Sequence, residues 1–496
     1  MRRRVNAMRC TMNSMAPHAG IAVLLLAALD PVARGRVLFE QNRFAEARGV
    51  LQTAVAGAPR NAEARYWLGF THFALGELEA ALVQLERAEP AYGSDPEFAF
   101  AIAEVYTRRA RQLSESLSQL PDASARRHQH FAHRHLARGD AENALRELRL
   151  AMERGARVAG LHQEAAEILW RQEKRAQAAA EWKAELGIAP LAFGANLRYG
   201  QYLLGVSEAA KALPHLVTAA RYRRYPEAHQ LLAHALRQLS RGGEARAVVE
   251  DGLAAFPRHE GLAEMLAGAA TKPFPLVPIG DGAGPSVAAL RARTGTDEHA
   301  LFRLHEIYTE RAEEWFAKLE KLAPGSARVS QAKALNAEYA DDFAAAETLY
   351  REALKQAAPR TPGLRFSLGH VLRMGGKLEE ADRELAAEIE LDAGHHLAWF
   401  ERGLVRMEQG AAAAAAPFLE KALALRPGLT AAQVELAKAH LQSGQPAKAA
   451  ALLEAVVRGN RRHPSAHFLL SRAYRAMGDA FRAARELEAH VALLGR

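Results

Sequence analysis

The fold is decided by residues 62–93, which read AEARYWLGFTHFALGELEAALVQLERAEPAYG. Apolar residues recur every three or four positions in two runs within this stretch, as they do on one face of an α-helix. The runs are separated by Gly76-Glu77-Leu78, where glycine permits a tight turn. The stretch therefore predicts two amphipathic helices that pack against each other across a short turn.

The same pattern returns along the chain with a period of 34 residues. With Ala62 as position 1 of a unit, small residues occupy positions 8 and 20. The first unit begins near Ala28 and has Gly35 and Ala47 at these positions. Seven further units have the pairs Ala166/Ala178, Gly200/Ala212, Ala233/Ala245, Gly369/Ala381, Gly403/Ala415, Ala437/Ala449 and Ser471/Ala483. The recurrence predicts an array of helix pairs.

This spacing resembles the tetratricopeptide repeat (TPR). In that family, small residues at positions 8, 20 and 27 let helices approach closely, and larger apolar residues at positions 4, 7, 11 and 24 fill the gaps. The resemblance covers roughly residues 28–267 and 298–494. It implies an all-α fold, an α-solenoid of about twelve helix-turn-helix repeats that forms a TPR-like superhelix.

A longer symmetry indicates that the chain is internally duplicated. Matching residues in Tyr106–Arg126 and Tyr308–Arg328 stand at a constant offset of 202. In both copies the unit that precedes the shared Ser-Ala-Arg is only 29 residues long and lacks the turn glycine. These units begin at Pro96 and at about Glu298. We interpret them as shortened, atypical repeats that the duplication copied.

A segment rich in proline and glycine divides the array. It contains Pro273, Pro275, Pro278 and Pro285, and such a composition disfavours a regular helix. We therefore expect a linker at 271–297, between an N-terminal TPR array at 28–270 and a C-terminal TPR array at 298–496.

The N-terminus has the order of a secretory signal peptide. Arg2, Arg3, Arg4 and Arg9 precede the apolar run Ile21–Leu29. We expect residues 1–29 to direct export, which would make the protein secreted or periplasmic. The alternative is a cytoplasmic protein in which this run opens the first helix. No stretch reaches the ~18 consecutive apolar residues of a membrane span. Apart from this possible signal, we therefore expect no transmembrane segment.

The residue types give no pattern for catalysis, a cofactor or a metal. Because Cys10 is the only cysteine, disulfides within the chain and cysteine-ligated clusters are excluded. The glycines of 280–284 follow prolines rather than a strand, so a phosphate loop is not expected. A metal site is not expected either, because the densest histidine cluster has no pair at a spacing of four on a helix. That cluster comprises His128, His130, His133 and His135.

The positive net charge suggests an alternative function, that of a nucleic-acid-binding scaffold. The net charge is +8, and Arg221–Tyr225 (RYRRY) alternates cations with rings, as stacking platforms do. The same arginines would also stabilise a helix C-terminus. Arginines scattered among 57 acidic residues favour a solvated surface over a nucleic-acid site.

The family resemblance implies a concave groove lined by positions 2, 5, 9, 12 and 13 of each first helix. Position 5 is repeatedly aromatic in this chain, at Tyr66, Phe100, Phe302, Phe366, Phe400 and Phe468. These rings are our candidate partner-binding residues, and the alternative is that they pack between neighbouring first helices. The family's clamp for a peptide carboxylate needs Lys at position 5 and Asn at position 9, and no repeat supplies that pair.

The sequence therefore predicts a non-enzymatic scaffold that binds a protein or peptide segment in its groove. A second hypothesis is a helical regulatory or accessory part of a sugar-transfer or cell-envelope enzyme complex. That role needs a catalytic domain elsewhere, because the repeats occupy both halves of this chain.

Overall fold

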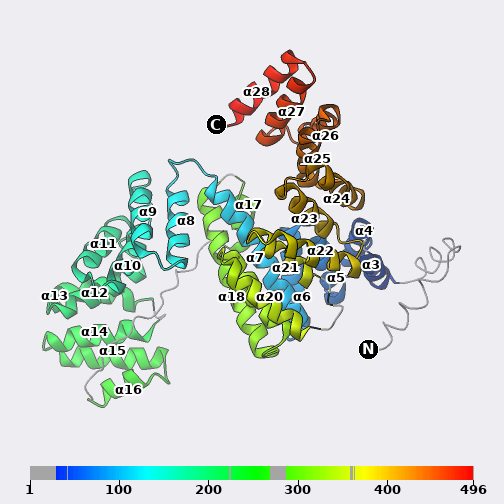
Figure 1. Ribbon diagram of the computed structural model, residues 1–496. Coiled ribbons are helices and arrows are strands. Elements are labelled where there is room, and N and C mark those ends of the chain that lie inside the picture. Colours follow the sequence, from blue (N-terminus) through cyan, green and yellow to red (C-terminus); the bar gives the residue numbers. More distant parts are fainter. Residues whose placement is uncertain are drawn as a thin grey trace. The chain divides into compact units, whose positions relative to one another are not determined.

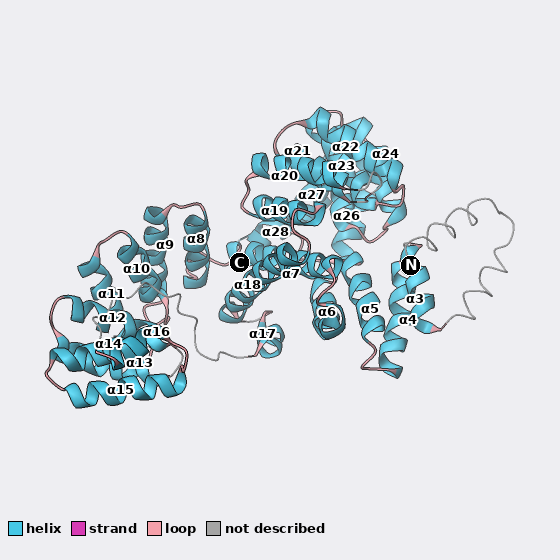
Figure 2. Ribbon diagram, turned by 90° about the horizontal axis from the view of Figure 1, so that it is seen from below, coloured by secondary structure: helices cyan, strands magenta, loops and turns pink. Residues whose placement is uncertain are grey.

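A computed structural model describes residues 30–41, 43–222, 225–268, 286–295, 297–357, 361 and 363–494 (Figure 1). These residues form 26 α-helices, α3–α28, and no strand, which confirms the predicted all-α class. Figure 2 shows them as helices and loops alone. No helix among them is long and apolar enough to cross a membrane. The predicted signal peptide, residues 1–29, lies outside the described residues.

The described residues form two compact units. Unit 1 comprises those up to Arg109 together with those from Tyr308 onward, and unit 2 is Ala110–Ile307. Both boundaries fall inside a long helix, α7 (Pro96–Ser118) or α18 (Glu298–Leu322). The two compact units therefore do not coincide with the two arrays that we expected on either side of residues 271–297.

Most of the described helices form hairpin pairs, eleven in all, close to the dozen repeats expected. Unit 1 contains α3 (Pro31–Glu40), α4 (Phe44–Gly57), α5 (Ala62–Ala74), α6 (Leu78–Tyr92), α19 (Ala327–Tyr339), α20 (Phe343–Gln356), α21 (Leu364–Met374), α22 (Leu378–Leu391), α23 (His396–Glu408), α24 (Ala412–Leu425), α25 (Thr430–Gln442), α26 (Pro446–Gly459), α27 (Pro464–Ala476) and α28 (Ala480–Leu494). Unit 2 contains α8 (Ala125–Ala137), α9 (Ala141–Arg154), α10 (Leu161–Arg171), α11 (Arg175–Ile188), α12 (Phe193–Gly205), α13 (Ala209–Ala220), α14 (Pro226–Gln238), α15 (Gly242–Ala255), α16 (Glu260–Leu266) and α17 (Val287–Arg293).

Small residues at position 8 allow the two helices of a pair to touch. A methyl group added at Gly369 would lie 2.7 Å from Cγ of Leu385, which occupies position 24 of the same repeat. At Gly403 the same methyl group would lie 2.6 Å from Cδ2 of Leu419. Carbon atoms do not approach this closely without displacement, so a larger side chain would force the helices apart.

Position 4 departs from the family pattern, because polar side chains replace the expected large apolar residue in several repeats. His128, for example, contacts Glu147 of the second helix at 2.8 Å and the carbonyl oxygen of Asp122, in the preceding loop, at 3.0 Å. His467 contacts Glu486 at 2.7 Å and the carbonyl oxygen of Arg461 at 3.1 Å. Hydrogen bonds therefore tie the preceding loop to both helices of these repeats, where apolar packing was expected.

The two units interpreted as shortened repeats are each one long helix, which corrects that interpretation. Without a turn glycine, α7 and α18 continue straight through the place where other repeats turn. The duplication is visible in their contacts. In unit 2 the guanidinium of Arg126 lies 5.2 Å from the ring centre of Phe302. At the equivalent place in unit 1, Arg328 lies 4.8 Å from Phe100.

The predicted linker is only partly described, and its described part contains a helix. Residues 271–285 lie outside the described residues. Helix α17 then begins at Val287, where the hydroxyl of Ser286 accepts a hydrogen bond from the backbone N–H of Ala289. The expectation that no helix forms within 271–297 is therefore wrong, because the prolines end before this N-cap.

Candidate partner-binding groove

Two of the six candidate rings are buried. Phe100 is 5% exposed and Phe302 is 1% exposed. Each is covered by an arginine from another helix, Arg328 on Phe100 and Arg126 on Phe302. Their burial agrees with the alternative interpretation, in which position 5 packs between helices.

Three more rings are half-buried against their own neighbours. The ring centre of Tyr66 lies 4.6 Å from that of Phe70 and 4.6 Å from that of Tyr92, and burial raises the pKa of Tyr66 to about 12. Phe366 lies 4.8 Å from the ring of His395. Phe400 packs on the apolar residues of α24. These rings keep some exposed surface, but they also contribute to the core.

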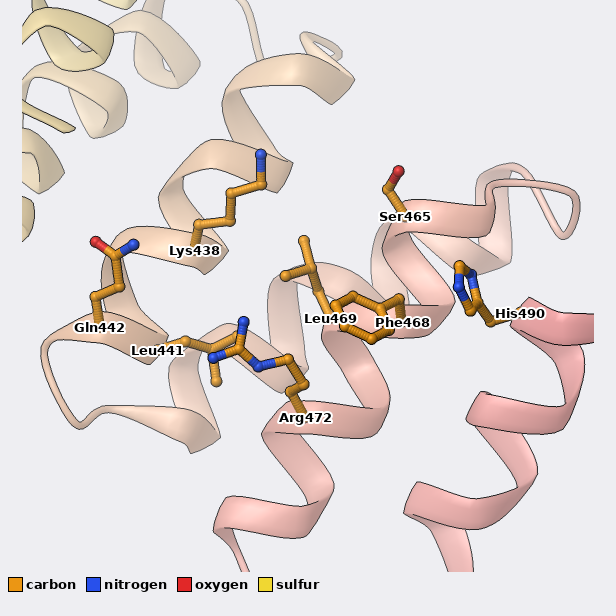
Figure 3. Close-up of a pocket in the computed structure, with 8 residues that line it drawn as sticks. All are labelled: Lys438, Leu441, Gln442, Ser465, Phe468, Leu469, Arg472 and His490. Atoms are coloured by element: carbon orange, nitrogen blue, oxygen red, sulfur yellow. The ribbon is translucent and has the colours of Figure 1, made fainter. Parts of the chain in front are cut away.

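Phe468 differs from the other five, because it is 41% exposed and lines a cavity of about 500 Å³ (Figure 3). The cavity is formed by α25, α27 and α28. Its lining residues are Lys438, Leu441, Gln442, Ser465, Phe468, Leu469, Arg472 and His490. A cavity of this size can take one or two side chains of a bound segment.

The lining matches the groove positions that the family resemblance implied. In α27, Ser465, Phe468 and Arg472 occupy positions 2, 5 and 9 of their repeat. In α25, Lys438, Leu441 and Gln442 occupy positions 9, 12 and 13. Two consecutive first helices therefore present their predicted groove side chains to one cavity.

The cavity has an apolar floor and basic edges. The ring of Phe468 lies beside Leu469 and 5.2 Å from the ring of His490. Lys438 makes an ion pair with Glu435 at 2.6 Å but stays 39% exposed. The guanidinium of Arg472 is exposed, and none of the eight lining residues is acidic.

The histidine cluster is divided among separate partners. His128 contacts Glu147, and His130 contacts the hydroxyl of Ser114 at 2.9 Å. His135 Nδ1 lies 3.3 Å from a carboxylate oxygen of Asp140. These three imidazoles therefore have separate partners.

A different group of possible metal ligands surrounds His133, and the spacing of residues in the sequence did not predict it. Ligand atoms of His133, Glu164 and Glu306 lie within 4.8 Å of one another and could hold a divalent cation. Burial alone would lower the pKa of His133, but Glu164 and Glu306 outweigh it and raise this pKa. The glutamates come from α10 and α18, so no local motif could have shown the group. The Arg303 guanidinium donates to Glu306 at 2.8 Å and already balances part of its charge.

The basic and aromatic segment Arg221–Tyr225 does not form a stacking platform in its described part. Tyr225 stacks on Phe193 at 5.2 Å, and the hydroxyl of Tyr222 donates to the carbonyl oxygen of Leu191 at 2.7 Å. Both tyrosines are therefore engaged by their own chain. Arg223 and Arg224 lie outside the described residues.

Comparisons with solved structures give low scores. MamA 41-end from Desulfovibrio magneticus RS-1 is 18% identical, with 34% of this chain and 94% of that chain covered and a TM-score of 0.33. YrrB, described as a TPR protein with an unusual peptide-binding site, is 17% identical, with 36% and 91% covered and a TM-score of 0.32. The Cut9–Hcn1 hetero-tetramer is 14% identical over 96% of both chains, with a TM-score of 0.34. No curated protein matches the chain.

Models of protein families match defined segments of the chain. Two tetratricopeptide repeat models match this chain, one at residues 38–105 and 406–462 and the other at 332–394 and 376–430. Their matches coincide with helix pairs of unit 1, and the close contacts at position 8 are those that the repeat requires. The chain therefore contains tetratricopeptide repeats, within residues 38–105 and 332–462.

Proposed function

We propose that the protein is a non-enzymatic scaffold that binds a segment of a partner protein in the groove formed by α25 and α27. One observation supports this most directly: positions 2, 5 and 9 of α27 and positions 9, 12 and 13 of α25 line one open cavity. An exposed ring at its floor supplies the kind of apolar anchor on which protein interfaces depend.

The proposal separates Phe468 from the other candidate rings. Phe100 and Phe302 are buried and have no surface to offer a partner. Phe366 and Phe400 share their surface with the core, so they would extend a binding site at most in part. We therefore place the main contact at Phe468.

Site-specific photo-cross-linking tests this function. A benzoylphenylalanine introduced at Phe468 should cross-link to a discrete partner in cells of the native host. The same group at Lys448, an exposed residue of α26 outside the cavity lining, is the control. Equal cross-linking at both places, or none at Phe468, would contradict a groove-binding scaffold.

We also propose that residues 1–29 direct export, on the strength of the order of arginines and apolar residues. Protein isolated from its host should then begin shortly after Leu29. An intact N-terminus in the cytosolic fraction would contradict this.

A further inference from the structure

We infer that the groove between α25 and α27 selects an acidic segment of a partner protein, in which carboxylate side chains flank one apolar side chain. This rests on the proposed function and adds the chemistry of the partner. The apolar side chain would lie against Phe468 and Leu469, and the carboxylates would pair with Lys438 and Arg472.

The lining of the cavity is basic. Two of its eight lining residues are cations and none is an anion. Arg472 is exposed and makes no ion pair among the described residues, whereas acids nearby are engaged elsewhere. Glu486 contacts His467, for example, and Glu454 accepts a hydrogen bond from Tyr474. A carboxylate arriving at Arg472 would therefore not displace an acid of this chain. One arriving at Lys438 would compete with Glu435, which pairs with that amine at 2.6 Å.

The surrounding charge has the same sign. Residues 430–494 contain nine Lys and Arg against five Asp and Glu, an excess of four out of the chain's net charge of +8. Such a local excess attracts an acidic partner over several ångströms and raises the rate of encounter.

The placement of the two cations indicates spaced carboxylates rather than a single one. Lys438 comes from α25 and Arg472 from α27, and Figure 3 shows their charged groups pointing in different directions. In the same view, Leu469 and Phe468 lie beside them as an apolar surface. A peptide with acids on both sides of one apolar residue fits this order of groups.

A nucleic acid fits less well. Single-stranded nucleic acids are held by successive stacking rings along a continuous basic track. The cavity offers one exposed phenylalanine, and that ring already faces His490. Other cations of this region, such as Lys448 and Arg458 on α26, do not line the cavity.

Fluorescence anisotropy with three short labelled peptides tests the inference on the full chain. The first peptide has one phenylalanine flanked by glutamates, the second has lysines in place of the glutamates, and the third has serine in place of the phenylalanine. We expect the first to bind at least about tenfold more tightly than either of the others.

Charge reversal provides the matched comparison. The variant Lys438→Glu/Arg472→Glu should bind the glutamate peptide about tenfold more weakly and gain affinity for the lysine peptide. Lys448→Glu/Arg458→Glu changes the net charge equally but lies outside the cavity, so it should retain the binding. If the first variant does not fold, as judged by circular dichroism, Lys438→Gln/Arg472→Gln replaces it.

The outcomes separate the inference from the proposed function. Equal binding of both phenylalanine peptides, lost in Phe468→Ala, would overturn the acidic preference and keep the groove. Failure of all three peptides would overturn the inference, and cross-linking at Phe468 would then decide the function independently. A single-stranded RNA oligonucleotide that competes at the cavity and depends on Arg472 would replace the acidic peptide as the ligand.

Discussion

Phe302 and Phe468 are each the fifth residue of their helix, α18 and α27, but lie in opposite environments. Phe302 is 1% exposed beneath the guanidinium of Arg126 and beside the ring of His133, 5.3 Å away. Phe468 is 41% exposed at the floor of an open cavity. The position of a ring along its helix therefore does not decide whether it belongs to the core or to a binding surface. What decides it is whether another segment covers the ring.

The largest effect should come from truncating the buried ring. Phe302→Ala should lower the free energy of unfolding by ~3–5 kcal/mol, because it leaves a cavity in a closed site. Phe468→Ala should lower it by about 1 kcal/mol, since much of that ring already faces solvent. Denaturant unfolding followed by circular dichroism measures both. Similar losses for the two variants would remove the distinction between them.

The close contact at position 8 should be nearly as sensitive. Gly369→Leu should destabilise unit 1 by ~1–3 kcal/mol, because its side chain would overlap Leu385. Gly187→Ala is a matched helical control, since an added methyl group there meets no atom within 4 Å. Thermal unfolding of both variants tests the repeat frame, and an unchanged melt for Gly369→Leu would show that the frame is misplaced.

The buried region around α8 and α18 should also be sensitive to acid. Burial lowers the pKa of His130 to about 3, with help from His305 and neighbouring cations, and burial lowers the pKa of His305 to about 4. Both lie below the ordinary value of 6.5, so the unfolded chain binds protons that the native state does not. The contribution of these neutral histidines to the free energy of unfolding should be fully present above about pH 6.5. It should fall by up to ~1.4 kcal/mol per pH unit for each histidine as the pH drops from 6.5 toward the lowered pKa.

Denaturant midpoints measured from pH 7 to pH 4 check this dependence. The double variant His130→Gln/His305→Gln removes both groups, so its midpoint should change less over the same range. A wild-type midpoint that is constant between pH 6.5 and pH 4.5 would contradict the account.

The smallest effect on peptide binding should come from the half-buried rings. Phe366→Ala/Phe400→Ala should lower the melting temperature more than Phe468→Ala does, because both rings pack on core residues of α21–α24. It should weaken peptide binding less than Phe468→Ala does, since neither ring lines the cavity. Melting curves and anisotropy titrations on the same samples compare the two properties. Lost binding with an unchanged melt would place the groove at Phe366 and Phe400 instead.

Local features of the fold could be predicted from the sequence. The glycine at position 8 and the leucine at position 24 stand in one short segment, so their contact follows from helix periodicity, as Gly369 and Leu385 show. The single long helix of α7 could not be recognised in this way, because a missing turn glycine is compatible with a short repeat as well as with a continuous helix.

The role of each ring could not be predicted, because it depends on distant segments. Arg126, which covers Phe302, lies 176 positions earlier in the chain. The group formed by His133, Glu164 and Glu306 likewise joins three separate helices. The groove positions around Phe468 were predictable from the family resemblance, but the exposure of its ring was not.

Thiol labelling tests the central distinction most directly. Cys10 is the only cysteine, so its replacement by serine leaves a chain in which Phe468→Cys or Phe302→Cys introduces the sole reactive thiol. We expect a maleimide to label the cysteine at position 468 nearly as fast as in denaturant. The cysteine at position 302 should react at least about a hundredfold more slowly, because it must wait for local unfolding. Equal labelling rates in the folded protein would contradict the difference in exposure between the two positions.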